Sequence, residues 1–306
     1  MYERMPTIAP AALTDDALRR LHEACLRETQ QLDGIPQLSF PDFCACVRTD
    51  DAQVMELRQD GEPAALLLFH LTQGQPCRLQ IPVYGCWYRS IRDLSELFGQ
   101  LLREVVQSTT VVSFFGYAHD AALYRYLTLT QFGVGMEYCV RRIAAAPSSG
   151  FSVRALSKAE IAAHWSELWA LVSRIIAHLK DSPVFYFGDE FTEAAYRAFF
   201  LDDDTTVYAA QDVQGRFIGL IESNGEAEPL LLSRQPAHNV GEVIVLPEYR
   251  GSGLAQALLA CCEGDLLRRG VIYDWVNHGT ANPNAMGFWD QYFQPYCFEF
   301  ERTITF

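Results

Sequence analysis

A segment suited to bind a phosphate group stands at residues 250–255, which read Arg-Gly-Ser-Gly-Leu-Ala. The apolar run Val240–Leu246 predicts a strand before this segment, and the residues after it predict a helix. The first N–H groups of a helix lack acceptors within the helix and carry partial positive charge, so they attract an anion. Gly251 and Gly253 suit a tight turn and leave the backbone uncovered, while Arg250 adds a fixed positive charge. The spacing therefore predicts phosphate binding at a helix N-terminus.

Two carboxylates on neighbouring predicted strands could remove a proton from a substrate. Glu242 lies on the strand that leads into the turn, and Asp274 lies on the next predicted strand, 271–276. If both side chains point into one cleft, they flank a bound amine and either could serve as the general base. The alternative is that one or both are ordinary solvated carboxylates, and His278, which titrates near neutrality, is a rival for Asp274.

Two short motifs make the chemistry of the turn more specific. Gln256 stands where a dinucleotide-binding fingerprint has its third glycine, so that fingerprint fails. The pattern Gln/Arg-x-x-Gly-x-Gly/Ala is met at 250–255, after a Val-x-Pro at 245–247. A second pattern, Asn-x-x-Ala-x-x-aromatic-aromatic, is met at 282–289. Together these motifs resemble the GNAT superfamily of acetyltransferases over at least residues 151–306.

The resemblance implies an α/β fold with a mixed sheet and acetyl-coenzyme A as the acetyl donor. The helix N-terminus is then expected to hold the coenzyme pyrophosphate, and the preceding strand to pair with the pantetheine arm. The implied coenzyme-binding residues are Val243, Val245, Arg250, Gly251, Ser252, Gly253, Leu254, Ala255 and Asn282. The implied reaction is direct attack of a primary amine, of a small molecule, on the acetyl group in a ternary complex, with no metal.

The sequence departs from the family where a tyrosine often serves as the general acid. That position is Trp289, whose indole has no usefully acidic proton. Tyr292, one turn further along, and Tyr296 are candidate replacements, and we name Tyr292 as the catalytic acid. The same departure keeps open a non-catalytic acyl-coenzyme A sensor or interaction module. Transfer of a longer acyl group is a third option.

The chain also contains signs of an internal duplication. Three pairs of similar residues are 161 positions apart: Tyr88 with Tyr249, Phe132 with Phe293, and Ile143 with Ile304. The small-residue segment Ala144–Gly150 near the midpoint predicts a linker. We therefore expect two tandem GNAT-like domains, residues 1–146 and 151–306, in the arrangement that mycothiol synthase represents.

The first of these domains has lost the features of the phosphate-binding turn. In the 161-residue register, Ser90 replaces Gly251, Arg92 replaces Gly253, and Asp93 adds a repelling charge. The counterpart of Asn282 in this register is Ala121. We expect this half not to bind acetyl-coenzyme A, and to complete the fold and wall the substrate site.

Bulk composition narrows the class of protein. The 306 residues carry a net charge of −14, which disfavours nucleic acid as a partner and is compatible with a cationic substrate. The nine cysteines include no CxxC pair; Cys44 and Cys46 would share a face if they lie on a strand, but no second cluster completes a metal site. With neither a signal peptide nor a membrane-spanning run in the sequence, we expect a cytoplasmic monomer or homodimer.

Overall fold

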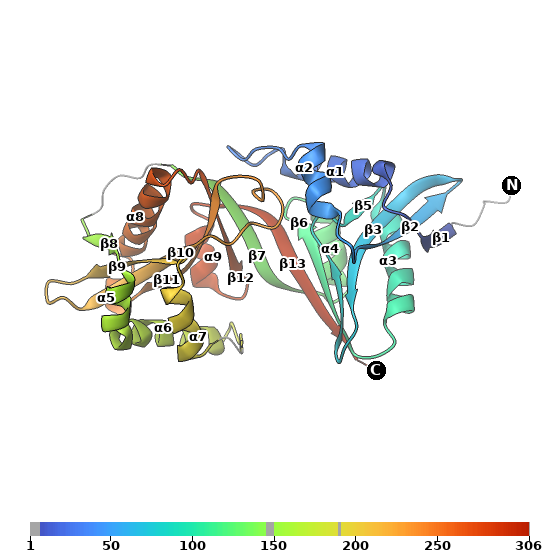
Figure 1. The fold of residues 1–306 in the computed structure, drawn as a ribbon. Helices are drawn as coiled ribbons and strands as arrows, with labels where there is room; N and C mark the ends of the chain where they lie inside the picture. The colour runs from blue at the N-terminus through green and yellow to red at the C-terminus, as the bar shows by residue number, and fades with distance from the viewer. Residues whose placement is uncertain (1–6, 145–149, 189–190, 306) are drawn as a thin grey trace. The chain divides into compact units, whose positions relative to one another are not determined.

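The computed structural model describes residues 7–144, 150–188 and 191–305, which form two compact α/β units (Figure 1). Unit 1 contains the described residues up to Cys139 together with those from Gln294 onwards. Unit 2 contains Val140–Phe293. Each unit has a mixed sheet with helices against it, so the predicted fold class is confirmed.

Unit 1 holds a sheet with strand order β1-β2-β3-β4-β6-β13-β7, and β5 pairs with β3 beside this path. Its strands are β1 (Thr7–Pro10), β2 (Gln53–Gln59), β3 (Glu62–Thr72), β4 (Cys77–Ile81), β5 (Cys86–Tyr88), β6 (Thr110–Tyr117), most of β7 (Gly133–Arg142), and β13 (Gln294–Ile304). Its helices are α1 (Asp15–Thr29), α2 (Phe40–Val47), α3 (Ile91–Val105) and α4 (Ala121–Leu129). The parallel pair β4–β6 stands among antiparallel pairs, which makes the sheet mixed.

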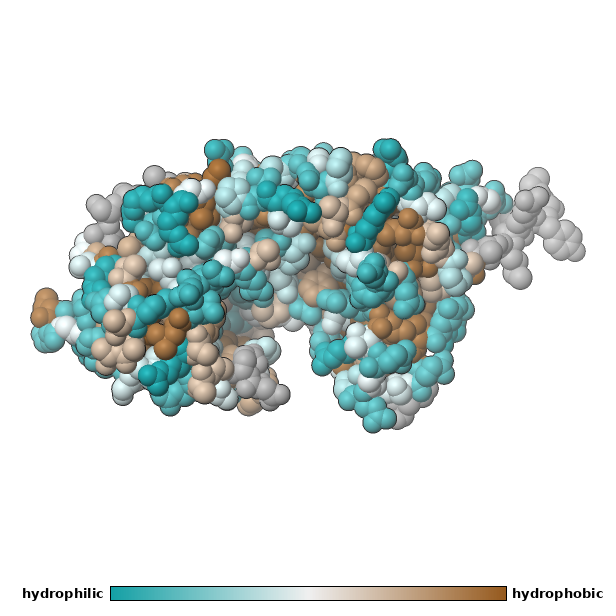
Figure 2. Space-filling model, viewed as in Figure 1, coloured by the Kyte–Doolittle hydropathy of each residue, from teal (hydrophilic) through white to brown (hydrophobic). Residues whose placement is uncertain are grey.

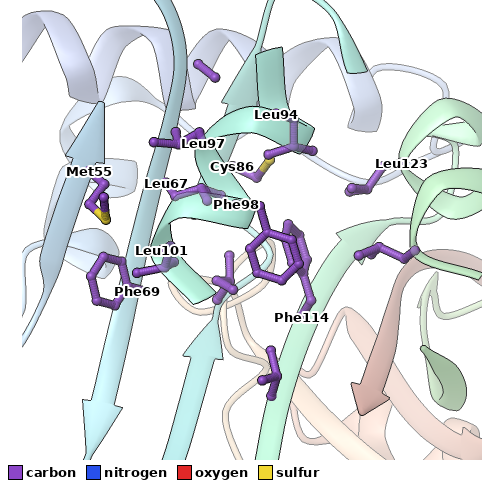
Figure 3. Packing of buried hydrophobic residues seen from close by; sticks show 14 of the residues in the cluster. Met55, Leu67, Phe69, Cys86, Leu94, Leu97, Phe98, Leu101, Phe114 and Leu123 are labelled. Atoms are coloured by element: carbon purple, nitrogen blue, oxygen red, sulfur yellow. The ribbon is translucent and has the colours of Figure 1, made fainter. Parts of the chain in front are cut away.

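The core of unit 1 forms where α3 packs on the sheet (Figure 3). Leu94, Leu97, Phe98 and Leu101 recur at helical spacing, are nearly or fully buried, and point from α3 toward the strands. The ring of Phe98 meets Phe114 of β6 edge to face, with centroids 5.5 Å apart. This packing fixes the start of α3, which is the counterpart of the predicted phosphate-binding turn.

Unit 2 holds the strand order β12-β11-β10-β9-β8, in which only β11–β12 is parallel. Its strands are β8 (Val153–Ala155), β9 (Thr206–Gln211), β10 (Phe217–Asn224), β11 (Ala237–Val245) and β12 (Tyr273–Gly279). Its helices are α5 (Lys158–Ala163), α6 (Trp165–Lys180), α7 (Glu193–Leu201), the 3-10 turn η1 (Pro247–Tyr249), α8 (Leu254–Arg268) and α9 (Pro283–Trp289). Val213, between β9 and β10, is a hydrophobic residue that is 95% exposed.

Local signals in the sequence of unit 2 predict its helices well. Ser157 caps α5 in a capping box, since its hydroxyl accepts from the Glu160 N–H and the Glu160 carboxylate accepts from the Ser157 N–H. The chain breaks at His164, after which α6 begins with the buried Trp165. The helix predicted after the glycine-containing turn is α8, which ends at Arg268.

The last strand does not lie in the half to which its sequence position assigned it. Cys297–Ile304 pair antiparallel with Tyr117–Thr110 of β6, so β13 belongs to unit 1. A strand joins the sheet that offers it an edge, and an alternating sequence does not say which edge that is. The predicted boundary at 146 and 151, and the linker around it, lie mostly outside the described residues.

Two smaller expectations are also corrected. Cys44 and Cys46 lie in helix α2, where residues two apart do not share a face, so they are not a strand-face ligand pair. The 161-residue register fails at the turns, because Tyr88 ends β5 whereas Tyr249 lies in η1. By helix N-cap position, Ser90 corresponds to Gly253, and Asp120 rather than Ala121 corresponds to Asn282. Within the described part of the chain, no helix has the length and apolar character needed to cross a membrane.

Candidate functional site

The site is built where the two parallel strands of unit 2 part. Ala237–Asn239 of β11 pair with Tyr273–Trp275 of β12, and among the described residues the parallel register goes no further. On its other edge, β11 stays paired with β10 as far as Val245. The stretch that carries Val243 and Val245 therefore keeps backbone groups on the β12 side for another extended chain, which is the role predicted for it.

A β-bulge marks the point of separation. The β10–β11 register shifts between the pairs Leu220–Ile244 and Glu222–Gly241, so two residues of β11 oppose one of β10. Glu242 sits in the bulge with φ of 34°, a conformation that few residues other than glycine adopt. Such bulges redirect side chains, and here the redirected side chain is the predicted base.

The turn after β11 ends in an open helix N-terminus. Gly251 and Gly253 have φ of 70° and 88°, and Gly253 is the N-cap of α8. Of the residues described, none supplies a side-chain cap to this helix. Leu254 is buried against Gly219 of β10, so it offers a ligand only its backbone N–H. Arg250, just before these glycines, is exposed. The turn therefore has the uncapped geometry that the predicted phosphate binding requires.

Glu242 meets a tyrosine that the sequence analysis did not single out. The hydroxyl of Tyr196, on α7, donates to Oε1 of Glu242 at 2.7 Å. Oε2 of Glu242 is buried and has no hydrogen-bond partner among the described residues. Burial raises the pKa of Glu242 to about 7, although the Tyr196 hydrogen bond opposes this rise by favouring the charged form. A carboxyl poised near neutrality is suited to general base catalysis.

A second buried acid, Glu222, lies beside this pair and was also missed. Its side chain is 3% exposed and folds over Gly241, where a Cβ atom would lie only 2.5 Å from its Oε1. Asn224 donates to its other oxygen at 3.3 Å. Burial, and then the nearby charge of Glu242, raise the pKa of Glu222 to about 8, so it is mostly protonated at neutral pH. The only sequence signal was a glutamate directly after the apolar run 217–221.

Asp274 has neighbours that differ from those of Glu242. It is fully buried, and its carboxyl faces the carboxyl of Glu263 on α8, which pairs with Arg141 at 2.9 Å. Burial and the adjacent Glu263 raise the pKa of Asp274 well above its ordinary value, which favours the protonated form of this carboxyl. The structure thus brings Asp274 to the α8 side of β12 and not to the Tyr196–Glu242 pair. Burial lowers the pKa of its rival His278, which is 6% exposed.

The residues of the second motif lie around helix α9. Asn282 is its N-cap, and its amide oxygen is the contact atom for the Ala285 N–H at 3.3 Å and for His178 Nε2 at 3.2 Å. Neither contact uses the amide NH2 group. Trp289 is buried and packs on Phe293, as a core residue does. The Tyr292 ring lies beside Phe288, with the Arg141 guanidinium 5.7 Å from its centroid.

The features described above lie within one match to a known protein family. Residues 172–293 match the model of the acetyltransferase (GNAT) family. This segment spans the base candidate, the separated strands, the open helix N-terminus and the second motif. A comparison with curated protein sequences found no match.

Solved structures give a likeness over the whole chain. A GCN5-related N-acetyltransferase from Sphaerobacter thermophilus is 14% identical with a TM-score of 0.58, and the alignment covers 98% of each chain. A tandem GNAT protein from the clavulanic acid biosynthesis pathway is 13% identical with a TM-score of 0.45, again over 98% of both chains. At 14% identity, the first likeness shows the fold of this chain and leaves its substrate to chemical argument.

Proposed function

We propose that this chain, which contains an acetyltransferase (GNAT) family domain at residues 172–293, transfers the acetyl group of acetyl-coenzyme A to a primary amine of a small molecule. The observation that carries the proposal is the parting of β11 from β12 after Asn239, with Glu242 in the bulge and an open helix N-terminus just beyond. One continuous stretch of sequence then supplies the strand edge for the pantetheine arm, the helix N-terminus for the phosphates, and the base.

The coenzyme is bound by backbone groups in this proposal. The N–H groups of Leu254, Ala255 and the residue after them take the pyrophosphate, and Arg250 adds charge. The pantetheine arm lies along Val243–Val245, in the place that β12 leaves. Asn282 donates its amide NH2 to a carbonyl of the arm, because its known contacts use the oxygen.

Acetyl transfer from an ammonium removes two protons from the nitrogen and returns one to the leaving sulfur. Glu242 takes the first proton from the bound ammonium, and the free nitrogen lone pair attacks the thioester carbonyl carbon. A backbone N–H of β11 stabilises the oxyanion, the C–S bond breaks, and coenzyme A leaves as a thiolate that takes a proton from the acid. The nitrogen gives up its second proton as the amide forms, and this proton restores the acid. Glu222 stays mostly protonated beside Glu242 at neutral pH, so it adds little charge next to the base. Tyr292 remains the proposed acid, whereas Asp274 is withdrawn because it belongs to the Glu263 pair.

The test is direct. Purified protein is incubated with acetyl-coenzyme A and a panel of amines, and both released coenzyme A and acetylated amine are measured by chromatography with mass detection. A thiol reagent is avoided because the nine cysteines of the chain would react with it. Stoichiometric product and coenzyme A support the proposal, whereas coenzyme A release without acetylated amine contradicts it.

One observation favours a second candidate, a non-catalytic acyl-coenzyme A sensor. Trp289 occupies the usual acid position and is buried in the core, so that position supplies no proton. The same assay separates the two functions. Tight coenzyme binding by calorimetry with no turnover on any amine identifies the sensor.

A further inference from the structure

Three consecutive large side chains in unit 2 are exposed between α6 and α7. Phe185, Tyr186 and Phe187 are 60%, 50% and 69% exposed. Their segment is built onto the end of α6, since the N–H of Phe185 donates to the Asp181 carbonyl and that of Tyr186 to the Leu179 carbonyl. Light-brown residues also lie along the lower edge of this unit, where Figure 1 shows α6 and α7 (Figure 2). Clustered exposed apolar side chains on a folded protein mark a binding surface.

A series of rings joins this surface to the proposed base. Tyr186 meets Phe191 edge to face with centroids 5.4 Å apart, and Phe191 lies 6.5 Å from Tyr196. Tyr196 is the residue whose hydroxyl donates to Glu242. Exposure rises outward along the series, from 6% at Tyr196, through the half-buried Phe191, to 50% at Tyr186. The rings therefore form a continuous series of contacts from the solvent-exposed Tyr186 to the tyrosine that holds the Glu242 carboxyl.

The charge beside these rings distinguishes between two kinds of amine. Lys180 holds its ammonium 5.7 Å from the centroid of Phe191, so the position next to this ring already contains a cation. The neighbouring Asp181 carboxylate accepts from the Ser182 N–H and is thereby held near its own backbone. A second ammonium group of a polyamine would meet the Lys180 ammonium, whereas a neutral ring carries no charge for Lys180 to repel. The negative net charge of the chain alone would have suggested the polyamine.

We propose that Tyr186, Phe191 and Tyr196 form the subsite for the non-reacting part of the acceptor, and that this acceptor is an amine bearing an aromatic or similarly flat apolar group. This inference rests on the proposed acetyl transfer and names the substrate class of that same site. Each ring that packs on the acceptor removes apolar surface from water, and its offset and edge-to-face contacts add to the attraction.

The test compares acceptors that share a primary amine and differ in the rest. Acetylation of 2-phenylethylamine, butylamine and spermidine is followed at saturating acetyl-coenzyme A. We expect kcat/KM for 2-phenylethylamine to exceed the other two by roughly 10-fold or more, the discrimination that an apolar pocket supplies. Phe191→Ala should then raise KM for 2-phenylethylamine about 10-fold with little change in kcat, and leave butylamine within about twofold.

Two further variants protect this test against simple misfolding. Tyr186→Ala changes a half-exposed ring and should raise the same KM about threefold, while Val213→Ala, at the exposed hairpin tip of the same unit, should change nothing. Unchanged coenzyme affinity in each variant shows that the fold persists. A preference for spermidine, or an equal effect of Phe191→Ala on all three amines, overturns the aromatic subsite and leaves acetyl transfer standing. Turnover of no amine overturns both.

Discussion

The N-terminus of α3 in unit 1 corresponds to that of α8 in unit 2, but the two are capped differently. At the N-terminus of α3, Ser90 accepts from the Asp93 N–H at 3.2 Å, and the Asp93 carboxylate accepts from the Ser90 hydroxyl and from Gln59, each at 2.7 Å. At the N-terminus of α8, the N-cap is Gly253, which has no side chain to offer. In unit 1 the Asp93 carboxylate thus lies at the start of the helix, whereas in unit 2 the start of the helix is open to the proposed ligand. The two helix starts therefore differ in the side-chain cap, which α3 has and α8 lacks.

The N-caps of α4 in unit 1 and α9 in unit 2 also differ in charge and in contacts. In unit 1 the hydroxyl of Tyr88, at the end of β5, donates to both oxygens of Asp120, the N-cap of α4, at 2.7 and 2.6 Å. Both residues line a small pocket of that unit. Burial, and then this carboxylate, raise the pKa of Tyr88, which keeps its proton on the hydroxyl. In unit 2 the corresponding N-cap is Asn282, a neutral amide. In unit 1 a side-chain hydrogen bond therefore links the end of β5 to the start of α4, whereas in unit 2 the strands β11 and β12 part.

The largest effect is expected from filling the open helix start. Gly253→Glu places a side chain at φ of 88° and a negative charge where the phosphate binds, so coenzyme A affinity should fall by at least about 1000-fold. Arg92→Ala, an exposed position in the first turn of α3, should leave the affinity within about twofold. Isothermal titration with coenzyme A measures both. Equal losses from the two variants would end the proposed division between the units.

Loss of the proposed base is expected to act on turnover alone. Glu242→Gln keeps the size of the side chain but cannot accept the ammonium proton, so kcat should fall about 100- to 10,000-fold. The matching stretch of unit 1, residues 81–86, contains no carboxylate that could replace it. Coenzyme A affinity should remain unchanged in calorimetry. A kcat within threefold of the parent protein would assign the proton transfer elsewhere.

The sequence predicted the open helix start better than it predicted the acids. The turn at 250–255 is local, because a strand end, two glycines and a helix follow one another in the chain, so its geometry could be read directly. Whether Asp274 and Glu242 meet depends instead on a bulge and on the packing of α8, which no local pattern encodes. For that reason the sequence could not tell that Asp274 faces Glu263.

Contacts between distant residues account for what the sequence did not predict at all. Glu222 became visible only once Gly241 was seen to lie opposite it, and Tyr196 only once α7 was placed against β11. The partner of β13 is likewise a choice between sheet edges and not a property of its residues. The structure has two α/β units, but the predicted 161-residue register does not hold at either turn.

Two tyrosine–carboxyl bonds, one in each unit, give a smaller and matched test. Glu242 must be ionised to accept a proton, so activity should rise with pH through its pKa of about 7. The Tyr196 hydroxyl lowers that pKa, so Tyr196→Phe should move the acidic limb of the kcat profile to higher pH. At pH 6.5 this should cost a few-fold in rate, and at pH 9 almost nothing. Tyr88→Phe removes the bond in unit 1 and should leave the profile in place. If Tyr196→Phe does not shift the profile, then Tyr196 does not set the pKa of the base.

The smallest expected effect separates the two helix starts by stability. Ser90→Ala removes the cap of α3, which is worth about 1 kcal/mol, so amide exchange in the first turns of α3 should speed up roughly fivefold. Ser252→Ala should not change exchange in α8, because the Ser252 hydroxyl donates to the Tyr249 carbonyl and caps no helical N–H. Adding coenzyme A should slow exchange at the start of α8 and leave α3 as it was, since α8 has no side-chain cap whereas Ser90 caps α3. Protection of α3 by coenzyme A would contradict this difference, because it would require the ligand to displace the Asp93 carboxylate from its own helix.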